Sequence, residues 1–333
     1  MQILESLADS TWRSVAEQCD YATFFHTPIW GNIVSETFDE YSSAPIGAEL
    51  DNGTRVILPL VKKSRVATKY GVSREISHLD STFAGCYGDI IADGPLTPEW
   101  TDVYDAALSK GDTLTVVDNP FANDRSNIGT ELGDVVEKTD DFTQVTDLRT
   151  DFETLFEEFQ SDVRENSHKA REMGASVQPV TEKARYREYF AVYQDSLERW
   201  GEDATNEYPW ELFETVCDYA QRHGENVKLW GTVVDGDLAY GQLTFYWNDH
   251  VVPWHAASNS DYFAYNPSDL LDVEVIKDAI ERGYDWYDFN PSGGHEGVVS
   301  YKSKFATRRR DVTRWQHTAA KLRYAKKVFE TIR

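Results

Sequence analysis

Cysteine is scarce in this chain, which has only three in 333 residues. Cys19, Cys86 and Cys217 stand far apart, so they lack the close spacing of a metal site, and their odd number does not fit a disulfide framework. Reduced thiols in a cytoplasm are the simplest interpretation. Cys86 is either a buried small side chain, which is the favoured interpretation, or a nucleophile.

Long hydrophobic runs are missing as well. No stretch approaches the roughly 18 apolar residues that a membrane-spanning helix needs. The N-terminus lacks the basic start and the long apolar core of a signal peptide. We therefore expect a cytoplasmic protein without a membrane span or a metal site, present as a monomer or a homodimer.

Positive charge is the third deficit. The chain has 33 lysines and arginines against 57 aspartates and glutamates, a net charge of −24. Strong salt screens the self-repulsion of such a surface, so the charge favours a salt-rich cytoplasm, such as that of a halophilic archaeon. An acidic face for a cationic partner is the alternative. The exception is the segment 301–333, which holds 11 basic and 2 acidic residues.

Composition and turn signals together predict the fold class. Hydrophobic residues make up 41% of the chain and aromatic residues 13%, which indicates one large or two medium globular domains. Asn52-Gly53 and Asp235-Gly236 each separate two apolar runs, a strong signal for a β-hairpin. Each half also has helical patterns, so we expect two related α+β domains in tandem, each a mostly antiparallel sheet flanked by helices. The expected boundaries are 1–148, 149–306 and a basic helical tail at 307–333.

The most informative stretch of the chain is 266–305. Apolar residues at helical spacing predict a buried helix that ends at Gly283. Residues 284–289 are predicted to form a strand, and a glycine-rich loop follows it. We expect a second short strand after the loop, in which Lys302 and Lys304 share one face.

This stretch resembles the C-terminal part of the FemAB-type acyltransferases, a family related to the GNAT acyltransferases. The matching residues lie at the helix end, in the strand and after the loop: Ala279, Glu281, Arg282, Gly283, Tyr284, Asp288, Phe289, Lys302 and Phe305. Three positions depart from the family pattern Y-x-F-K-x-x-F-G. Val299 replaces the first Tyr, Tyr301 replaces the Phe before the lysine, and Ala306 replaces the final Gly.

Shorter matches follow the order of the family along the rest of the chain. They are Thr27, Pro28 and Trp30, an LPL strand within 56–61, a substrate-side loop similar to YGG within 83–91, and Arg164, Lys169, Ala170 and Gly174. The resemblance covers most of the chain. It implies two GNAT-like domains packed together with a cleft between them.

The resemblance also implies a working lysine. Lys302 is expected to face the reacting carbonyl or a phosphate and to stabilise the tetrahedral oxyanion. Lys304 is the other candidate for this role. The alternative is that Lys302 is a solvated lysine on an edge strand. We expect Lys302 in a cleft, within reach of loops 83–88 and 291–297. Asp288 is the candidate general base, although a local cap or ion pair is the favoured interpretation of this residue. His255 and His295 are its alternatives as a base, and the resemblance implies that the substrate itself can also serve for proton transfer.

Candidate substrate-binding residues come from both halves of the chain. They are Trp30, Phe83, Tyr87, Gly88, Arg164, Lys169, His255, Asn290, Tyr301 and Lys304. Arg164 and Lys169 belong to a basic island that either binds an anion or pairs with neighbouring glutamates.

The segment before the helix of 266–305 bears on the acyl donor. A GNAT enzyme that uses acetyl-CoA has a glycine-rich loop there, whose N–H groups hold the pyrophosphate. This chain has Asp-Tyr-Phe-Ala-Tyr-Asn-Pro-Ser at 261–268, without glycine. The sequence therefore argues against ordinary CoA binding, and either acyl-CoA or aminoacyl-tRNA remains as a co-substrate, with no permanently bound cofactor.

The sequence thus predicts an acyltransferase that joins an acyl or aminoacyl group to an amine of a small molecule, a sugar nucleotide or a peptide. One alternative is a non-catalytic GNAT-like module that binds RNA or another polyanion. The other is a plain acetyl-CoA-dependent N-acetyltransferase. The basic tail contacts tRNA, an anionic membrane surface or the chain's own acidic body.

Overall fold

The computed structural model describes residues 1–69, 72–81, 83, 87–122, 136–201 and 207–319. The chain forms two compact units, the first made of Met1–Asp141 and Asp311–Arg333 and the second of Phe142–Arg310. It passes from the first unit to the second within strand β9 (Val136–Asp147) and returns within strand β15 (Arg308–Thr318). In the described part of the chain, no helix is long and apolar enough to cross a membrane.

The C-terminal segment differs from its prediction. A helical tail was expected from residue 307, but Arg308–Thr318 form strand β15, and its second part pairs with β8 (Thr113–Val117). Val312 and Trp315 of β15 are buried, and this burial stabilises the strand against β8. Residues 320–333 lie outside the described part of the chain.

The first unit contains two sheets. Their orders are β1-β3-β4-β7 and, in part, β15-β8-β6-β5-β2. The Asn52-Gly53 hairpin is confirmed, because β3 and β4 pair antiparallel around it. The elements of this unit, besides β8, are β1 (Gln2–Ile3), α1 (Asp9–Gln18), η1 (Phe24–His26), α2 (Pro28–Thr37), β2 (Tyr41–Ser43), β3 (Ile46–Glu49), β4 (Arg55–Leu58), β5 (Val61–Lys69), β6 (Val72–Asp80), β7 (Ile91–Ala92), η3 (Pro98–Thr101) and α3 (Asp102–Lys110).

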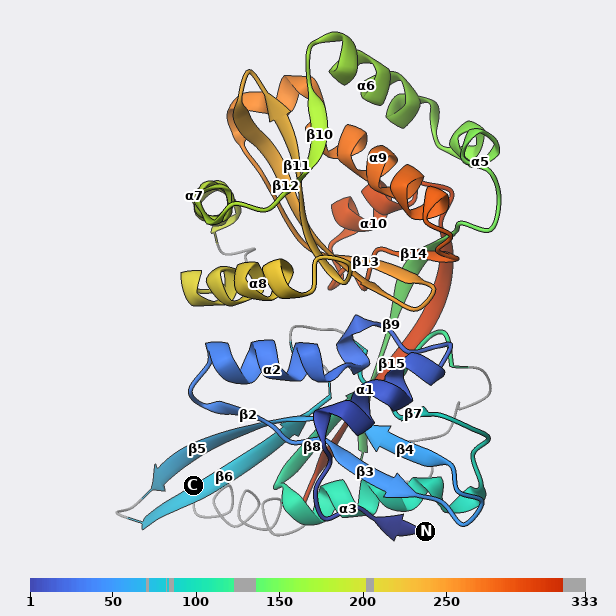
Figure 1. Cartoon of the computed structure of the whole chain (residues 1–333). Coiled ribbons are helices and arrows are strands. Elements are labelled where there is room, and N and C mark those ends of the chain that lie inside the picture. The colour runs from blue at the N-terminus through green and yellow to red at the C-terminus, as the bar shows by residue number, and fades with distance from the viewer. Residues whose placement is uncertain (70–71, 82, 84–86, 123–135, 202–206, 320–333) are drawn as a thin grey trace. The chain divides into compact units, whose positions relative to one another are not determined.

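The second unit is built on the sheet β10-β11-β12-β13-β14-β9, in which only β13 and β14 run parallel. Helices α7 and α8 pack on one face of this sheet and α9 packs on the other (Figure 1). The Asp235-Gly236 hairpin is confirmed by the pairing of β11 with β12. The elements, besides β9, are α5 (Phe152–Glu158), α6 (Ser161–Glu172), β10 (Ser176–Val180), α7 (Lys183–Trp200), α8 (Trp210–Arg222), β11 (Val227–Val234), β12 (Asp237–Trp247), β13 (His250–Ser258), η5 (Ser260–Tyr265), α9 (Pro267–Glu281), β14 (Trp286–Asp288) and α10 (Glu296–Lys302).

Helix α9 forms the centre of the second unit. Its apolar residues are buried almost all round, which is typical of a helix with protein on every side. Gly283 follows the helix with a φ of 82°, the left-handed conformation that ends helices at low cost. The buried residues include two carboxylates, Asp269 and Asp272, so the interior of this unit is not purely apolar.

Helix α10 stands where the sequence predicted a strand. Val298, Tyr301 and Lys302 follow the helical spacing i, i+3, i+4, and all three line the same cavity. In a strand, Tyr301 and Lys302 would point to opposite sides, so the helix is what brings them together. Lys304 lies beyond the end of α10.

Candidate active site

A cavity of the second unit lies where β13 and β14 separate. These strands pair in parallel only at His250 with Trp286 and at Val251 with Tyr287. Beyond these pairs, residues 253–258 of β13 line one side of a cavity of about 520 Å³, and residues 289–291 line the other.

The sequence of β13 explains the separation. Pro253 has no N–H to donate to a neighbouring strand. The register with β12 shifts at Trp254, because Leu243 faces His255 whereas Thr244 faces Pro253, which makes a β-bulge. Asn290 closes the point of separation, since its side-chain amide donates to the carbonyl of Pro253 over 3.0 Å.

Lys302 brings a buried cation to this cavity. Its side chain lines the cavity and the residue is 8% exposed. The Nζ donates to the carbonyl of Asn290 over 2.7 Å and to that of Pro291 at 3.4 Å. Asn290 has a φ of 60°, a left-handed conformation that asparagine tolerates better than most residues. The ammonium group is thus held by main-chain oxygens at the edge of the cavity, in reach of loop 291–297 as predicted.

Asp272 lines the cavity from α9 and was not among the predicted site residues. The carboxylate is 1% exposed and accepts hydrogen bonds from Gln242 (2.9 Å), Tyr287 (2.6 Å) and Tyr301 (2.6 Å). Burial raises the pKa of Asp272, and the three donors and the charge of Lys302 oppose that rise. An aspartate within the apolar face of a predicted buried helix was the signal in the sequence.

His255 lines the same cavity from β13, among aromatic rings. Its Nδ1 lies 2.5 Å from the Tyr189 hydroxyl, and rings of Tyr193, Phe213 and Trp254 surround it. Burial lowers the pKa of His255 to about 3, so the imidazole is neutral and a weak proton acceptor near pH 7. This environment favours His255 as part of the cavity wall over its predicted alternative role as a general base.

The lowered pKa of His255 makes a testable contribution to stability. An unfolded chain protonates this side chain near pH 6.5, whereas the folded chain does so near pH 3. The stabilising contribution is therefore present above pH 6.5 and is lost as the pH falls from 6.5 toward 3. Between pH 7 and pH 5, we expect the free energy of unfolding of the wild type to fall by about 1–2 kcal/mol more than that of His255→Phe.

The measurement is urea unfolding of the wild type and His255→Phe at both pH values. The variant keeps one partner of Tyr189, whose hydroxyl also donates to the main-chain carbonyl of residue 255 over 3.0 Å. Equal pH dependence in the two proteins would contradict the assignment.

Asp288, the predicted general base, is fully buried and is not among the residues that line the cavity. Its carboxylate accepts from the Thr143 hydroxyl over 2.5 Å and from the main-chain N–H of Asn290 over 2.9 Å. The second bond forms an Asx turn, which fixes the position of Asn290. The geometry favours Asp288 as a residue that shapes the turn under Lys302.

The predicted substrate-binding residues of the first unit lie in or near its core. Trp30 and Phe83 line a cavity of about 10 Å³, which has room for about one water molecule. Tyr87 is fully buried. A Cβ at Gly88 would lie 1.5 Å from the main-chain oxygen of Ser81, so this glycine is required by packing. Cys86 lies outside the described residues, and an approach of Lys302 to 83–88 stays a prediction.

Three further candidates lie away from the cavity of the second unit. Lys304 pairs with Asp162 of α6 at 2.5 Å, so the expected shared face with Lys302 is wrong. Lys169 of the same helix is exposed and Arg164 is half-buried. Of the predicted residues, the structure therefore brings His255, Asn290, Tyr301 and Lys302 to one cavity.

Comparisons with known proteins identify the class of this second half. Residues 157–303 match the family model described as an acetyltransferase (GNAT) domain. None of the curated proteins matches the chain in sequence. The second half of the chain is therefore similar to a GNAT domain, and the protein is an acyltransferase.

The whole chain is similar in fold to several solved structures. The crystal structure of FemX has a TM-score of 0.73 at 11% identity, with 98% of this chain and 99% of that chain covered. The C-terminal domain of a protein described as a putative lysylphosphatidylglycerol synthetase from Agrobacterium fabrum has a TM-score of 0.55 at 12% identity, with 93% of this chain and 92% of that chain covered. L-PGS from Bacillus licheniformis has a TM-score of 0.54 at 9% identity, with 93% of this chain and 92% of that chain covered. The predicted α+β fold with tandem GNAT-like units is confirmed.

Proposed function

We propose that this protein transfers an acyl or aminoacyl group to an amine of a small molecule, a sugar nucleotide or a peptide, in the cavity between β13 and β14. The observation that carries the proposal is the buried Lys302 ammonium group at the edge of that cavity. A buried cation costs free energy unless it is well paired, so its presence beside a cavity supports a functional role.

Aminolysis of an ester or a thioester passes through a tetrahedral intermediate with a negatively charged oxygen. The Lys302 Nζ, held by the carbonyls of Asn290 and Pro291 at the edge of the cavity, would place its positive charge beside that oxygen. The cation would be effective here because a largely buried charge is screened less by water than an exposed one. Lys302 would therefore stabilise the transition state more than the bound acyl donor.

The start of α9 bears on which donor is used. The GNAT domain indicates acyl-CoA as the general class. In this chain Pro267 provides no N–H at the first turn, and Asp269, which is 5% exposed, adds negative charge there. Both features weaken a pyrophosphate site, so they support a donor whose phosphates are bound elsewhere, such as an aminoacyl-tRNA.

The arginines of β15 were predicted to contact tRNA, a membrane surface or the chain itself. Arg309 lies over the ring of Phe142 at 4.0 Å, and Arg310 lies over Trp286 at 4.4 Å. These contacts support packing on the chain itself for both side chains. Arg308 and Arg314 are exposed and are the better candidates for a contact with a polyanion.

A donor screen tests the proposed function. The protein would be mixed with CoA thioesters or aminoacyl-tRNAs and a set of amines, in high salt, and the acceptors analysed by mass spectrometry. We expect one donor class to give an amide product and to raise the melting temperature. Equal stabilisation by charged and uncharged tRNA, with no product, would contradict the proposal and favour a non-catalytic RNA-binding module.

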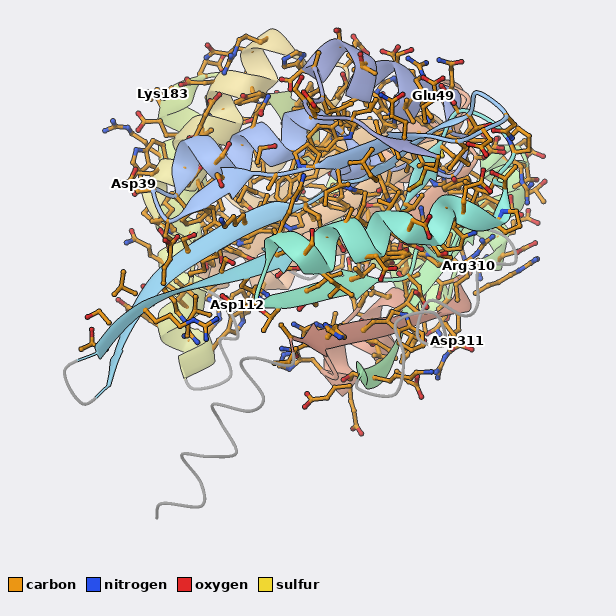
Figure 2. The ribbon with its side chains drawn as sticks, turned by 90° about the horizontal axis from the view of Figure 1, so that it is seen from below. Asp39, Glu49, Asp112, Lys183, Arg310 and Asp311 are labelled. Atoms are coloured by element: carbon orange, nitrogen blue, oxygen red, sulfur yellow. The ribbon has the colours of Figure 1, made fainter. Side chains whose placement is uncertain are left out.

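The net charge supports a salt-rich cytoplasm as the setting of this protein. Asp39 and Glu49 of the first unit, labelled in Figure 2, are examples of its exposed acidic side chains. Salt screens the repulsion among the acidic side chains of the protein. We therefore expect the melting temperature to rise as potassium chloride is increased from about 0.1 M to about 2 M. A melting temperature that stays flat or falls over this range would contradict the halophilic interpretation.

A further inference from the structure

A carboxylate and a tyrosine of the cavity have no role in the function proposed so far. Tyr301 of α10 and Asp272 of α9 both line the cavity, and their side chains are hydrogen-bonded to each other at 2.6 Å. The family pattern has Phe at the position of Tyr301, so the hydroxyl group is a feature of this chain. A hydroxyl bonded to a buried carboxylate beside a buried lysine is an arrangement that moves protons in many active sites.

We propose that Tyr301 and Asp272 form a proton relay that takes the proton of the acceptor amine during acyl transfer. This inference rests on the proposed function and adds to it the residues that handle the proton. Tyr301 is the catalytic residue that touches the amine, and Asp272 is the proton acceptor behind it.

The hydrogen bonds fix the direction of the relay. A tyrosine hydroxyl has one proton to donate, and Tyr301 gives it to the Asp272 carboxylate. Its oxygen is then left with lone pairs as acceptors. Because Tyr301 lines the cavity, such an oxygen is suited to accept an N–H of an amine placed there.

The partners of Asp272 hold its carboxylate in place. Gln242 and Tyr287 donate to one carboxylate oxygen, and Tyr301 donates to the other. Burial alone would favour the protonated acid, and these donors together with the charge of Lys302 favour the ionised form. A carboxylate under two opposing influences is suited to take up a proton and to release it again.

The charged and titratable groups that interact with Asp272 come from β12, β14, α10 and α9 itself. Tyr240 on β12, Tyr287 on β14, and Tyr301 and Lys302 on α10 interact with it, and Asp269 lies near it on α9. The charge of Lys302 favours the ionised form of Asp272.

The transfer step balances with these groups. The amine enters as a free base, and its nitrogen attacks the acyl carbon to form the C–N bond. The N–H proton passes to the Tyr301 oxygen while the Tyr301 proton passes to Asp272. The C–S bond of a thioester or the C–O bond of an ester then breaks, and the leaving atom takes a proton from Tyr301, which recovers one from Asp272.

The chain offers a matched control for this role. Tyr287 donates to Asp272 over the same 2.6 Å as Tyr301, but it is not among the residues that line the cavity. Tyr301→Phe and Tyr287→Phe therefore each remove one tyrosine hydrogen bond of the same length to Asp272, and only the first changes a residue that lines the cavity. A merely structural role predicts similar effects of the two changes.

The experiment measures kcat and KM of both variants and of Asp272→Asn with the donor and acceptor found in the screen. We expect Tyr301→Phe to lower kcat by about 10²- to 10⁴-fold with little change in the KM of the donor. Tyr287→Phe should lower kcat by less than about tenfold. The double variant Tyr301→Phe/Asp272→Asn should be no slower than the slower single variant, since both changes remove one relay.

Three outcomes would overturn the relay. They are a wild-type kcat in Tyr301→Phe, equal losses in Tyr301→Phe and Tyr287→Phe, and independent, multiplicative losses in the double variant. If Asp272→Asn does not fold, the comparison of the two tyrosine variants still decides. Failure of the relay alone would leave transfer dependent on Lys302, whereas failure of the proposed function would leave no transfer in the wild type.

Discussion

Lys302→Met is expected to lower kcat for acyl transfer by about a hundred- to a thousandfold. Loss of one oxyanion donor typically costs about 2.7–4 kcal/mol of barrier, which corresponds to this range. Methionine keeps most of the length and volume of the side chain and removes only its charge and its hydrogen bonds. The measurement is the single-turnover rate with a saturating donor, because this rate reports the chemical step.

Lys304→Met is the matched control for Lys302→Met. It removes a lysine two positions away, whose Nζ pairs with Asp162 and does not line the cavity. We expect it to leave the transfer rate within about twofold of the wild type and to change stability little, since ion pairs near the surface contribute about 0–1 kcal/mol. Equal loss of rate in both lysine variants would show that general charge, not the position of Lys302, matters.

Loss of Lys302 should also affect stability. In the structure, Lys302 is buried and satisfies the carbonyls of Asn290 and Pro291. Replacement leaves these two acceptors without that partner, so a moderate loss of stability, about 1–3 kcal/mol, is expected beside the loss of rate.

Gly88→Ala is expected to be the most destabilising single change among those considered. The new Cβ would lie 1.5 Å from the main-chain oxygen of Ser81 and 2.5 Å from its carbonyl carbon. Because these are main-chain atoms, no side-chain rotation relieves the clash, and the segment itself must move. We expect a loss of at least about 4 kcal/mol, measured as a large fall in melting temperature or as failure to fold.

Gly297→Ala is the control for this change. A Cβ at Gly297 would meet nothing within 4 Å, and the residue lies in α10. Alanine favours a helix over glycine by about 1 kcal/mol, so melting should stay unchanged or rise slightly. Similar melting of Gly88→Ala and the wild type would contradict the packing described for the first unit.

The sequence predicted those parts of the fold that local patterns control. The helix before Gly283 was predicted because its apolar residues recur at helical spacing and a glycine follows its last turn. Both hairpins were clear because Asn-Gly and Asp-Gly favour the tight turns of antiparallel strands. The short helix α10 was missed, since its seven residues follow a glycine-rich loop and include Val298 and Val299, which also suit a strand.

The site was harder to predict because long-range contacts build it. Asp272 meets its three partners from positions 15, 29 and 30 residues away in the chain. A sequence pattern places Asp272 on a helix but does not show which side chains from β12, β14 and α10 converge on it. For Trp30 and Phe83 a role in binding stays a prediction, because aromatic residues in a short motif suit a core as well as a binding site.

The most direct test of the central claim is a crystal structure of the protein with a stable donor analogue, in which a ketone replaces the reactive ester or thioester. We predict that the analogue occupies the cavity between β13 and β14, with the Lys302 Nζ about 3 Å from the ketone oxygen. An analogue bound elsewhere, or bound in this cavity with its carbonyl turned away from Lys302, would contradict the account.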